Sequence, residues 1–278
     1  MFYREIPPVS ELARFIRCLW VLRYPSETPV REPERVVPDG CCELIINRAA
    51  PFVQIHTDGE RQWHPSMMLV GQITRFILIE PTGDVNLIGI RFEPGGLHAL
   101  LGLNVGEIRD QRIALSSFST SLSCRLEEAA GREDLNGLQQ TLLGLLPKST
   151  RSCTLIERAV EEISSAHGDL TIADLGRRLA VTPRQLERRF RHEVGLTPKR
   201  FSRILRFNAL LQLSRNRPGD NWTQHSLACG YYDQAHLVRD CQDLAGMSPS
   251  AFRADRHPLT DFFSTGENMS DFSKSSKR

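Results

Sequence analysis

The 278-residue sequence predicts a two-domain protein, in which an α+β domain precedes an all-α domain. Three observations lead to this prediction: short apolar runs separated by turn dipeptides in the first half, a helical unit that occurs twice near the C-terminus, and a difference in charge between the halves. Residues 1–150 hold 15 basic and 18 acidic side chains, whereas residues 151–258 hold 17 and 12. We expect domains at 1–150 and 151–258, followed by a disordered tail at 259–278 that lacks a periodic apolar face.

The first half is predicted to form a mostly antiparallel sheet with added helices. Turn dipeptides such as Asp58-Gly59 and Gly83-Asp84 separate its apolar runs, as in chains of hairpins. A short helix with an apolar stripe is expected first, over 8–17. Strands are expected over 19–22, 41–47, 52–56, 68–70, 76–80 and 85–92, a proline-rich loop over 26–33, and helices over 97–101, 115–130 and 135–146.

The second half repeats one unit of helix, three-residue turn and helix between residues 170 and 252. The two copies keep a constant offset over matching positions, which pair Leu186 with Leu237, Gly195 with Gly246, Pro198 with Pro249 and Phe201 with Phe252. In the first copy Thr182 is an N-cap followed by Pro183 at the first helical position. A further helix is expected before the repeat, over 153–166.

The second helix of the first copy has two different sides. Leu186, Phe190 and Val194 recur every four residues, so one side is apolar. The other side is mostly cationic and carries Arg184, Glu187, Arg188 and Arg191. A helix that is apolar inward and cationic outward suits the major groove of DNA.

The double unit resembles the C-terminal DNA-binding domain of the AraC/XylS family of bacterial transcription regulators. The resemblance covers about 100 residues and implies seven helices, with a long linking helix over 198–215. Two N-terminal stretches, 37–45 and 89–96, resemble an uncharacterised domain found in a subset of AraC-like regulators. By analogy with that domain, the sheet is expected to be cupin-like or sandwich-like.

The resemblance implies a sequence-specific regulator that binds double-stranded DNA with its two helix-turn-helix units in successive major grooves. Arginine can donate to guanine, glutamate can accept from cytosine, and glutamine can pair with adenine. A solvated charged face is the alternative interpretation of the same side chains. The expected base-reading residues are Arg184, Glu187, Arg188, Gln234, His236 and Arg239.

A second group of residues is expected to contact DNA phosphates. Lys199, Arg200 and Arg203 lie near the start of the linking helix, where cations oppose the helix dipole unless an external anion is near. Thr171 caps the first helix of the first unit and could present that N-terminus to a phosphate. Simple solvation remains the alternative for these cations.

The second unit departs from the family pattern in its core. His225 stands where Ile or Val is usual, Ser226 where Ala is usual, and Cys241 matches Phe190 of the first copy. Lost packing would loosen this unit. Alternatively, Trp222 and Tyr231 fill the space.

Composition bounds the remaining functions. No apolar run is long enough to span a membrane and no signal-peptide core follows Met1, so we expect a cytoplasmic protein that does not contact membranes. The seven cysteines show no C-x-x-C spacing, so neither a disulfide framework nor a zinc knuckle is indicated. Adjacent Cys41 and Cys42 either sense oxidants or, as buried thiols, only pack.

No catalytic residue, metal or cofactor is predicted. His56 and His64 lie near Asp58 and Glu60, which is either a ligand cluster or a pair of loop histidines. The alternative function is a DNA alkylation-repair methyl acceptor with an AraC-like module, yet that chemistry needs four cysteines around zinc. Besides DNA, the expected partners are a small-molecule effector, RNA polymerase and a second copy of the chain, since the N-terminal domain would either sense a ligand or mediate dimerisation.

Overall fold

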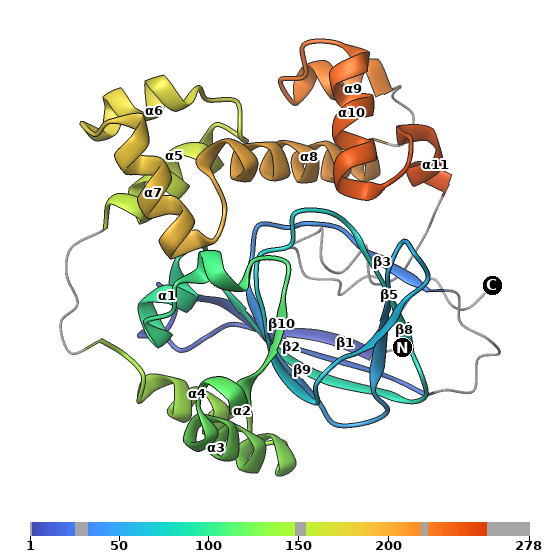
Figure 1. Cartoon of the computed structure of the whole chain (residues 1–278), viewed down its shortest axis with the longest axis vertical. Coiled ribbons are helices and arrows are strands. Elements are labelled where there is room, and N and C mark those ends of the chain that lie inside the picture. The colour runs from blue at the N-terminus through green and yellow to red at the C-terminus, as the bar shows by residue number, and fades with distance from the viewer. Residues whose placement is uncertain (1, 26–32, 148–153, 218–221, 255–278) are drawn as a thin grey trace.

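The computed structural model describes residues 2–25, 33–147, 154–217 and 222–254, and it places a helical layer on one end of a β-sandwich (Figure 1). The sandwich contains a six-stranded sheet in the order β1-β2-β9-β4-β7-β10 and a four-stranded sheet in the order β3-β8-β5-β6. Every strand pair in both sheets is antiparallel, so the predicted mostly antiparallel sheet is confirmed.

The strands of the first sheet are β1 (Phe2–Ile6), β2 (Ile16–Tyr24), β4 (Glu43–Asn47), β7 (Met67–Val70), β9 (Val85–Phe92) and β10 (Arg112–Ala114). Those of the second sheet are β3 (Glu34–Val36), β5 (Phe52–Ile55), β6 (Arg61–Trp63) and β8 (Ile77–Pro81). The helices that follow are α1 (Gly96–Leu101), the 3-10 helix η1 (Val105–Ile108), α2 (Leu115–Phe118), α3 (Thr120–Gly131) and α4 (Leu135–Leu143).

The six-stranded sheet is buried on both faces. In β2, Leu19 and Val21 pack into one core with residues of α1, α3 and α4, whereas Trp20 and Leu22 point toward the second sheet. This alternation follows from the period of two in a strand. The chain therefore forms a sandwich-like domain with one core between its sheets and another between the larger sheet and the helices.

The helical layer contains α5 (Leu155–Ser165), α6 (Ile172–Leu179), α7 (Pro183–Val194), α8 (Pro198–Asn216), α9 (Trp222–Ala228), α10 (Gln234–Ala245) and α11 (Pro249–Ala254). Within the described residues these are the seven helices that the family resemblance implied. They share a core that includes Leu175, Phe190, Phe207 and Leu237. In Figure 1, α8 runs across the top of the sandwich, with α6 and α7 at one end and α9, α10 and α11 at the other.

Several expectations for the N-terminal half need correction. Residues 10–15 form turns, and the expected helix over 8–17 is absent because Ile16 already belongs to β2 and buries its side chain there. The helix expected over 115–130 is divided at Ser119, whose extended backbone caps α3 through its side chain. Strands β1, β3, β6 and β10 were not predicted.

The proline-rich loop falls mostly outside the described residues, as do the expected domain boundary at 147–150 and the tail, apart from Pro33 and Pro147. Among the helices of the described ranges, none combines the length and the apolar character needed to cross a membrane.

Candidate nucleic-acid interface

The first helix-turn-helix unit is formed by α6 and α7, and its backbone geometry follows from its turn residues. Ala180 adopts a left-handed conformation after α6, with φ 53°. Thr182 then accepts a hydrogen bond from the Gln185 backbone, the Gln185 side chain accepts one from the Thr182 backbone, and Pro183 opens α7. Gly195, with φ 91°, ends the helix, as its left-handed conformation favours.

The two sides of α7 match their sequence-based assignment. Leu186, Phe190 and Val194 are at most 1% exposed. Arg184 and Arg188 are exposed, and Glu187 is half-buried. Glu187 accepts a hydrogen bond from Arg191 Nη2 at 2.8 Å, so its carboxylate already has a cationic partner. Arg189 and Arg191 are exposed as well, but they pair with Glu193 and Glu187, so Arg184 and Arg188 are the arginines of α7 that have no ion-pair partner among the described residues.

The second unit places a less basic surface on α10. Asp233 caps the helix by accepting from the His236 backbone at 2.6 Å. Gln234 and Arg239 are exposed, whereas His236 is half-buried and its ring meets Tyr231 edge-on at 5.0 Å. Leu237, Cys241 and Leu244 point into the core.

Aromatic side chains occupy the core of the second unit where its sequence departs from the family pattern. Tyr231 is 2% exposed and belongs to the shared core, against which Trp222 also packs. His225 is 1% exposed and lies edge-on to Trp222 at 6.1 Å. This arrangement favours compensated packing over a loosened unit, although neither ring nitrogen of His225 has a hydrogen-bond partner within the described residues, which costs stability.

A single helix joins the two units. Thr197 caps α8 by accepting from the Arg200 backbone at 3.1 Å, and Phe201, Ile204 and Phe207 anchor it in the core. The helix has 19 residues, and at 1.5 Å per residue it spans about 28 Å. Helices of both units pack against it.

The candidate phosphate contacts differ in accessibility. Lys199 is exposed. Thr171 is also exposed, but its hydroxyl donates to Asp174 at 2.6 Å while accepting from the Asp174 backbone. Arg200 and Arg203 have side chains only 19% and 27% exposed.

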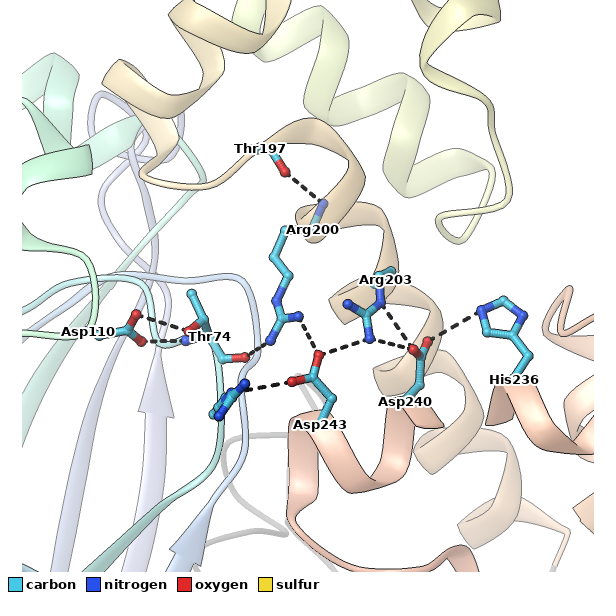
Figure 2. Close-up of polar contacts among 9 residues, drawn as sticks. Thr74, Asp110, Thr197, Arg200, Arg203, His236, Asp240 and Asp243 are labelled. Atoms are coloured by element: carbon cyan, nitrogen blue, oxygen red, sulfur yellow. Dashed lines mark hydrogen bonds and ion pairs between the residues drawn. The ribbon is translucent and has the colours of Figure 1, made fainter. Parts of the chain in front are cut away.

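Two carboxylates of α10 hold these arginines (Figure 2). Arg203 donates to the 2%-exposed Asp240 at 2.6 Å and to Asp243 at 2.9 Å, and Arg200 donates to Asp243 at 2.5 Å. Partial burial opposes the ionisation of Asp243, yet both guanidinium groups together hold its pKa below the usual value. The N-terminal part of α8 and one side of α10 are thus tied together by charge.

The same cluster reaches the N-terminal domain through the loop between β7 and β8. Arg200 also donates to the Thr74 carbonyl, and Arg75 lies 3.3 Å from Asp243. The backbone N–H and the hydroxyl of Thr74 donate to the Asp110 carboxylate, at 2.7 and 3.0 Å. One guanidinium therefore contacts both domains (Figure 2).

The N-terminal domain also lies beside the exposed side of α7. An open cleft of about 930 Å³ separates η1 from this helix. Glu107 and Asn104 line one wall and Arg184 and Arg188 the other. At the foot of the cleft, Gly106 lies so close to the Arg191 carbonyl that a Cβ there would be 2.9 Å from it. An acidic side chain thus faces the cationic surface of α7.

Cys41, Cys42 and His56 have ordinary structural surroundings. Burial raises the pKa of the Cys41 and Cys42 thiols, which favours packing over oxidant sensing. His56 Nε2 lies 3.1 Å from Gln62, and the described residues contain no group of three or more His, Cys, Asp and Glu side chains that could hold a metal.

Sequence reasoning missed Asp240, Asp243, Glu107 and Thr74. The arginines that pair with Asp240 and Asp243 lie 37 and 40 residues away, Arg200 lies 126 residues from Thr74, and Glu107 lines its cleft with residues of the other domain, so no local pattern reports these contacts. The one available signal was the pair of acids at i and i+3 on α10, and that spacing is common on solvated helices.

Comparison with known proteins supports the two-part organisation. Residues 175–255 match the family described as a helix-turn-helix domain, and residues 4–114 match a domain of unknown function, DUF6597. The chain is 39% identical over 85 residues to the HTH-type transcriptional regulator CdhR of Pseudomonas aeruginosa. This similarity covers 31% of the chain and spans 25% of that relative.

Two solved structures found by comparison have low sequence identity to this chain and TM-scores below 0.5. An apo form of ToxT from Vibrio cholerae is 12% identical with a TM-score of 0.46, over 84% of this chain and 96% of that one. The AraC-like transcriptional activator CuxR is 14% identical with a TM-score of 0.25, over 72% and 83% of the two chains. From the family matches, the chain joins a DUF6597 domain to a C-terminal helix-turn-helix domain of the AraC type, as the sequence resemblance implied.

Proposed function

We propose that this protein is a transcription regulator that binds specific double-stranded DNA through α7 and α10, which we call the recognition helices. One observation carries the proposal: each recognition helix is anchored in the core by apolar side chains and presents polar side chains able to contact base edges on its opposite side. For base reading we assign Arg184, Glu187 and Arg188 in the first unit and Gln234, His236 and Arg239 in the second.

The linking helix supports binding in successive major grooves. On one face of B-DNA, the major groove recurs about every 34–36 Å. The helix α8 spans about 28 Å and packs against both units, and in this proposal it holds the recognition helices at the spacing of the grooves. Because α8 buries a continuous apolar side, the separation would stay fixed while the protein searches DNA.

Phosphate contacts would add affinity that depends on salt. Thr171 and Lys199 are exposed enough to make them in the present arrangement. Arg200 and Arg203 would need to share or exchange their carboxylate partners, and Arg200 would also have to leave the Thr74 carbonyl. In this proposal the N-terminal domain competes with DNA for Arg200.

The N-terminal domain would regulate DNA binding by holding both units. It contacts α7 through η1, and α10 through Arg75 and through Arg35, whose Nη1 donates to the Ala245 carbonyl at 2.8 Å. A small-molecule effector, or pairing with a second copy of the chain, would alter these contacts and so shift the population of DNA-competent molecules. RNA polymerase is a further proposed partner.

Methyl transfer in DNA repair is the alternative that we reject. It needs a zinc-bound thiolate, and the cysteines of the described residues form no group with metal-binding geometry. Zinc analysis of the purified chain provides the check: one equivalent of tightly bound zinc together with methyl uptake would reinstate the repair function.

Selection of bound sites from random DNA by the whole chain tests the proposal. We expect enrichment of two short half-sites with centres about 10–10.5 base pairs apart. The double variant Arg184→Ala/Arg188→Ala should lose one half-site and keep the other. The double variant Arg177→Ala/Arg132→Ala, which also removes two exposed arginines, is the matched control and should still select both half-sites. Enrichment of no sequence at all would refute specific recognition.

A further inference from the structure

A mostly apolar cavity lies between the two sheets of the N-terminal domain. Its volume is about 80 Å³, and it is partly open to solvent. The six-stranded sheet contributes Trp20, Ile45 and Met68, and the four-stranded sheet contributes Phe52 and Ile79. About 10–15 Å³ of such volume holds one water molecule, so the cavity could admit a small organic body of a few carbons.

A row of side chains along the cavity wall follows from the register of four strands. Arg112 pairs with Val70, Val70 with Glu43, and Glu43 with Arg91. Side chains at paired positions share a face of the sheet. On the cavity side of the sheet, Arg112, Val70, Glu43 and Arg91 therefore follow one another on the neighbouring strands β10, β7, β4 and β9.

The acidic members of the cavity lining already have cationic or hydrogen-bonding partners. Glu43 accepts from Arg91 at 2.9 Å and from the Trp20 indole at 3.1 Å. Asp39 accepts from the Cys41 backbone at 2.9 Å and lies 3.7 Å from Arg91. The fully buried Arg91 thus neutralises this end of the row.

In the described part of the chain, Arg112 at the other end forms no ion pair with a carboxylate, and the Asp110 charge only partly offsets the effect of its burial. Two strand spacings of about 4.8 Å separate its backbone from that of Glu43. Its Nη1 donates only to the Asp110 carbonyl, at 3.1 Å, while the Asp110 carboxylate is held by Thr74. Within the described residues Nη2 of Arg112 is buried without a hydrogen-bond partner.

His64 lies in the same part of the cavity and is likewise unsatisfied. Its Nε2 is buried and has no hydrogen-bond partner in the described part of the chain. Burial, together with the charges of Arg112 and His56, lowers the pKa of His64 to about 4. Burial also lowers the pKa of Arg112 to about 10. The unsatisfied guanidinium nitrogen of Arg112 and the unsatisfied Nε2 of His64, which donates in one tautomer of the neutral ring, therefore border an apolar space, and this environment favours an anion.

We propose that this cavity binds a small monocarboxylic acid, with its carboxylate on Arg112 and His64 and its apolar body between Trp20, Ile45 and Met68. A planar carboxylate matches the fork of a guanidinium, and it would satisfy Arg112 Nη2 and, in the tautomer protonated at Nε2, His64 at once. The proposal rests on the proposed function for its regulatory meaning, since the acid would be the effector.

The cavity wall continues into the contacts that hold the DNA-binding domain. Gly71, Ile73 and Ile77 line the cavity, and the residues between them include Thr74 and Arg75. The turn that carries Asp39 and Cys41 also touches α8, because the Pro38 carbonyl accepts from Asn208 at 3.1 Å. A ligand that displaces either wall would therefore shift α8 or α10.

Calorimetric titration of the whole chain, without DNA, tests the ligand assignment. The probes are hexanoate, the neutral hexanamide and the cationic hexylamine. We expect one site that binds hexanoate about tenfold more tightly than hexanamide, since charge-assisted hydrogen bonds are roughly twice as strong as neutral ones. Hexylamine should not bind. No saturable binding of hexanoate, or equal binding of hexylamine, would overturn the proposal.

Variants separate the two halves of the site. Arg112→Gln should bind hexanoate and hexanamide equally, whereas Val70→Phe should exclude both by filling the cavity. The exposed Arg109→Gln is the matched control and should behave as the unmodified chain. Should Arg112→Gln fail to fold, His64→Gln supplies a second test through a smaller loss of carboxylate preference. Persistence of the full preference in either folded variant contradicts the assignment.

The regulatory half is measured separately, on the DNA site that selection provides. Saturating hexanoate should change affinity for that site at least threefold, roughly, in the unmodified chain and not in Arg112→Gln. Unchanged affinity would overturn the regulatory role. Hexanoate binding by a chain that selects no DNA would instead refute the proposed function and leave the ligand site standing.

Discussion

Arg203 of α8 lies 2.6 Å from the carboxylate of Asp240 on α10, and Asp240 is only 2% exposed. The pair therefore fixes the second recognition helix against the linking helix in a largely dehydrated setting. Removing one partner of such a pair leaves a buried charge without compensation. Both the stability of the second unit and its orientation toward DNA should depend on this contact.

Arg203→Ala is expected to lower the free energy of unfolding by about 2–4 kcal/mol, because Asp240 then remains buried and unpaired. It should also weaken binding to all DNA sequences alike and, if Arg203 contacts a phosphate, flatten the salt dependence of affinity by about one unit of slope. Asp240→Asn is the partner variant. If Arg203 contacts both a phosphate and Asp240, Asp240→Asn should lower DNA affinity but keep the salt slope of the unmodified chain. Equal salt slopes in Asp240→Asn and Arg203→Ala would contradict the phosphate contact.

Arg188→Ala should affect sequence choice. Because Arg188 is exposed on α7 and no neighbour in the described structure forms an ion pair with it, its loss should leave stability nearly unchanged. We expect a loss of about 1–3 kcal/mol in binding to the preferred site and relaxed preference at one or two base pairs. Competition binding against single-base variants of that site measures both effects, and a uniform loss across all of them would argue against base reading.

Glu107→Gln should increase DNA affinity. Glu107 lines the cleft opposite Arg184 and Arg188, where it would oppose an approaching phosphate backbone. At a separation of roughly 7 Å in water, removing one like charge is worth about threefold in affinity at low salt. Glu128→Gln, on α3, provides the control, since its carboxylate is exposed and paired with Arg132. An equal gain in both variants would show only an effect of net charge.

His64 should make the protein less stable in acid. Its folded pKa of about 4 lies below the usual value of 6.5, so the unfolded chain binds the proton more readily between these limits. Above about pH 6.5, His64 is neutral in both states and does not lower the free energy of unfolding. As the pH decreases from about 6.5 toward 4, the free energy of unfolding falls, because protons bind the unfolded chain first. The neighbouring Arg112 and His56 oppose protonation in the same direction. Urea unfolding at pH 5 and 7 should show a smaller pH effect in His64→Gln than in the unmodified chain.

Much of the helical domain could be predicted from sequence because its signals are local. Thr182, Pro183 and Gly195 mark the ends of α7, and Leu186 and Phe190 mark its buried side. Repetition of this pattern supplied the second unit. The outward direction of Arg184 and Arg188 follows from the helical period alone.

The β-domain and the contacts between domains were harder to predict. The exposed β6 and the three-residue β10 have no apolar alternation, and they exist because β5 and β7 supply their hydrogen-bond partners. The opposite error occurred over 8–17, where apolar residues at helical spacing predicted a helix. In the structure these residues form a turn and the start of β2. Contacts such as Arg200 with Thr74 join residues 126 apart, and only the folded chain brings them together.

Because α8 is one uninterrupted helix, its length fixes the rotation of the second helix-turn-helix unit relative to the first. One residue inserted into this helix would rotate the second unit by about 100° relative to the first, and would turn its outward surface away from the duplex. Seven inserted residues would nearly complete two rotations and lengthen the helix by about 10.5 Å. Half-sites moved apart by about three base pairs would also turn by roughly 100° around the duplex, so the lengthened chain should no longer place both units in grooves on one face, and the length of one helix would limit the operators that the protein can bind.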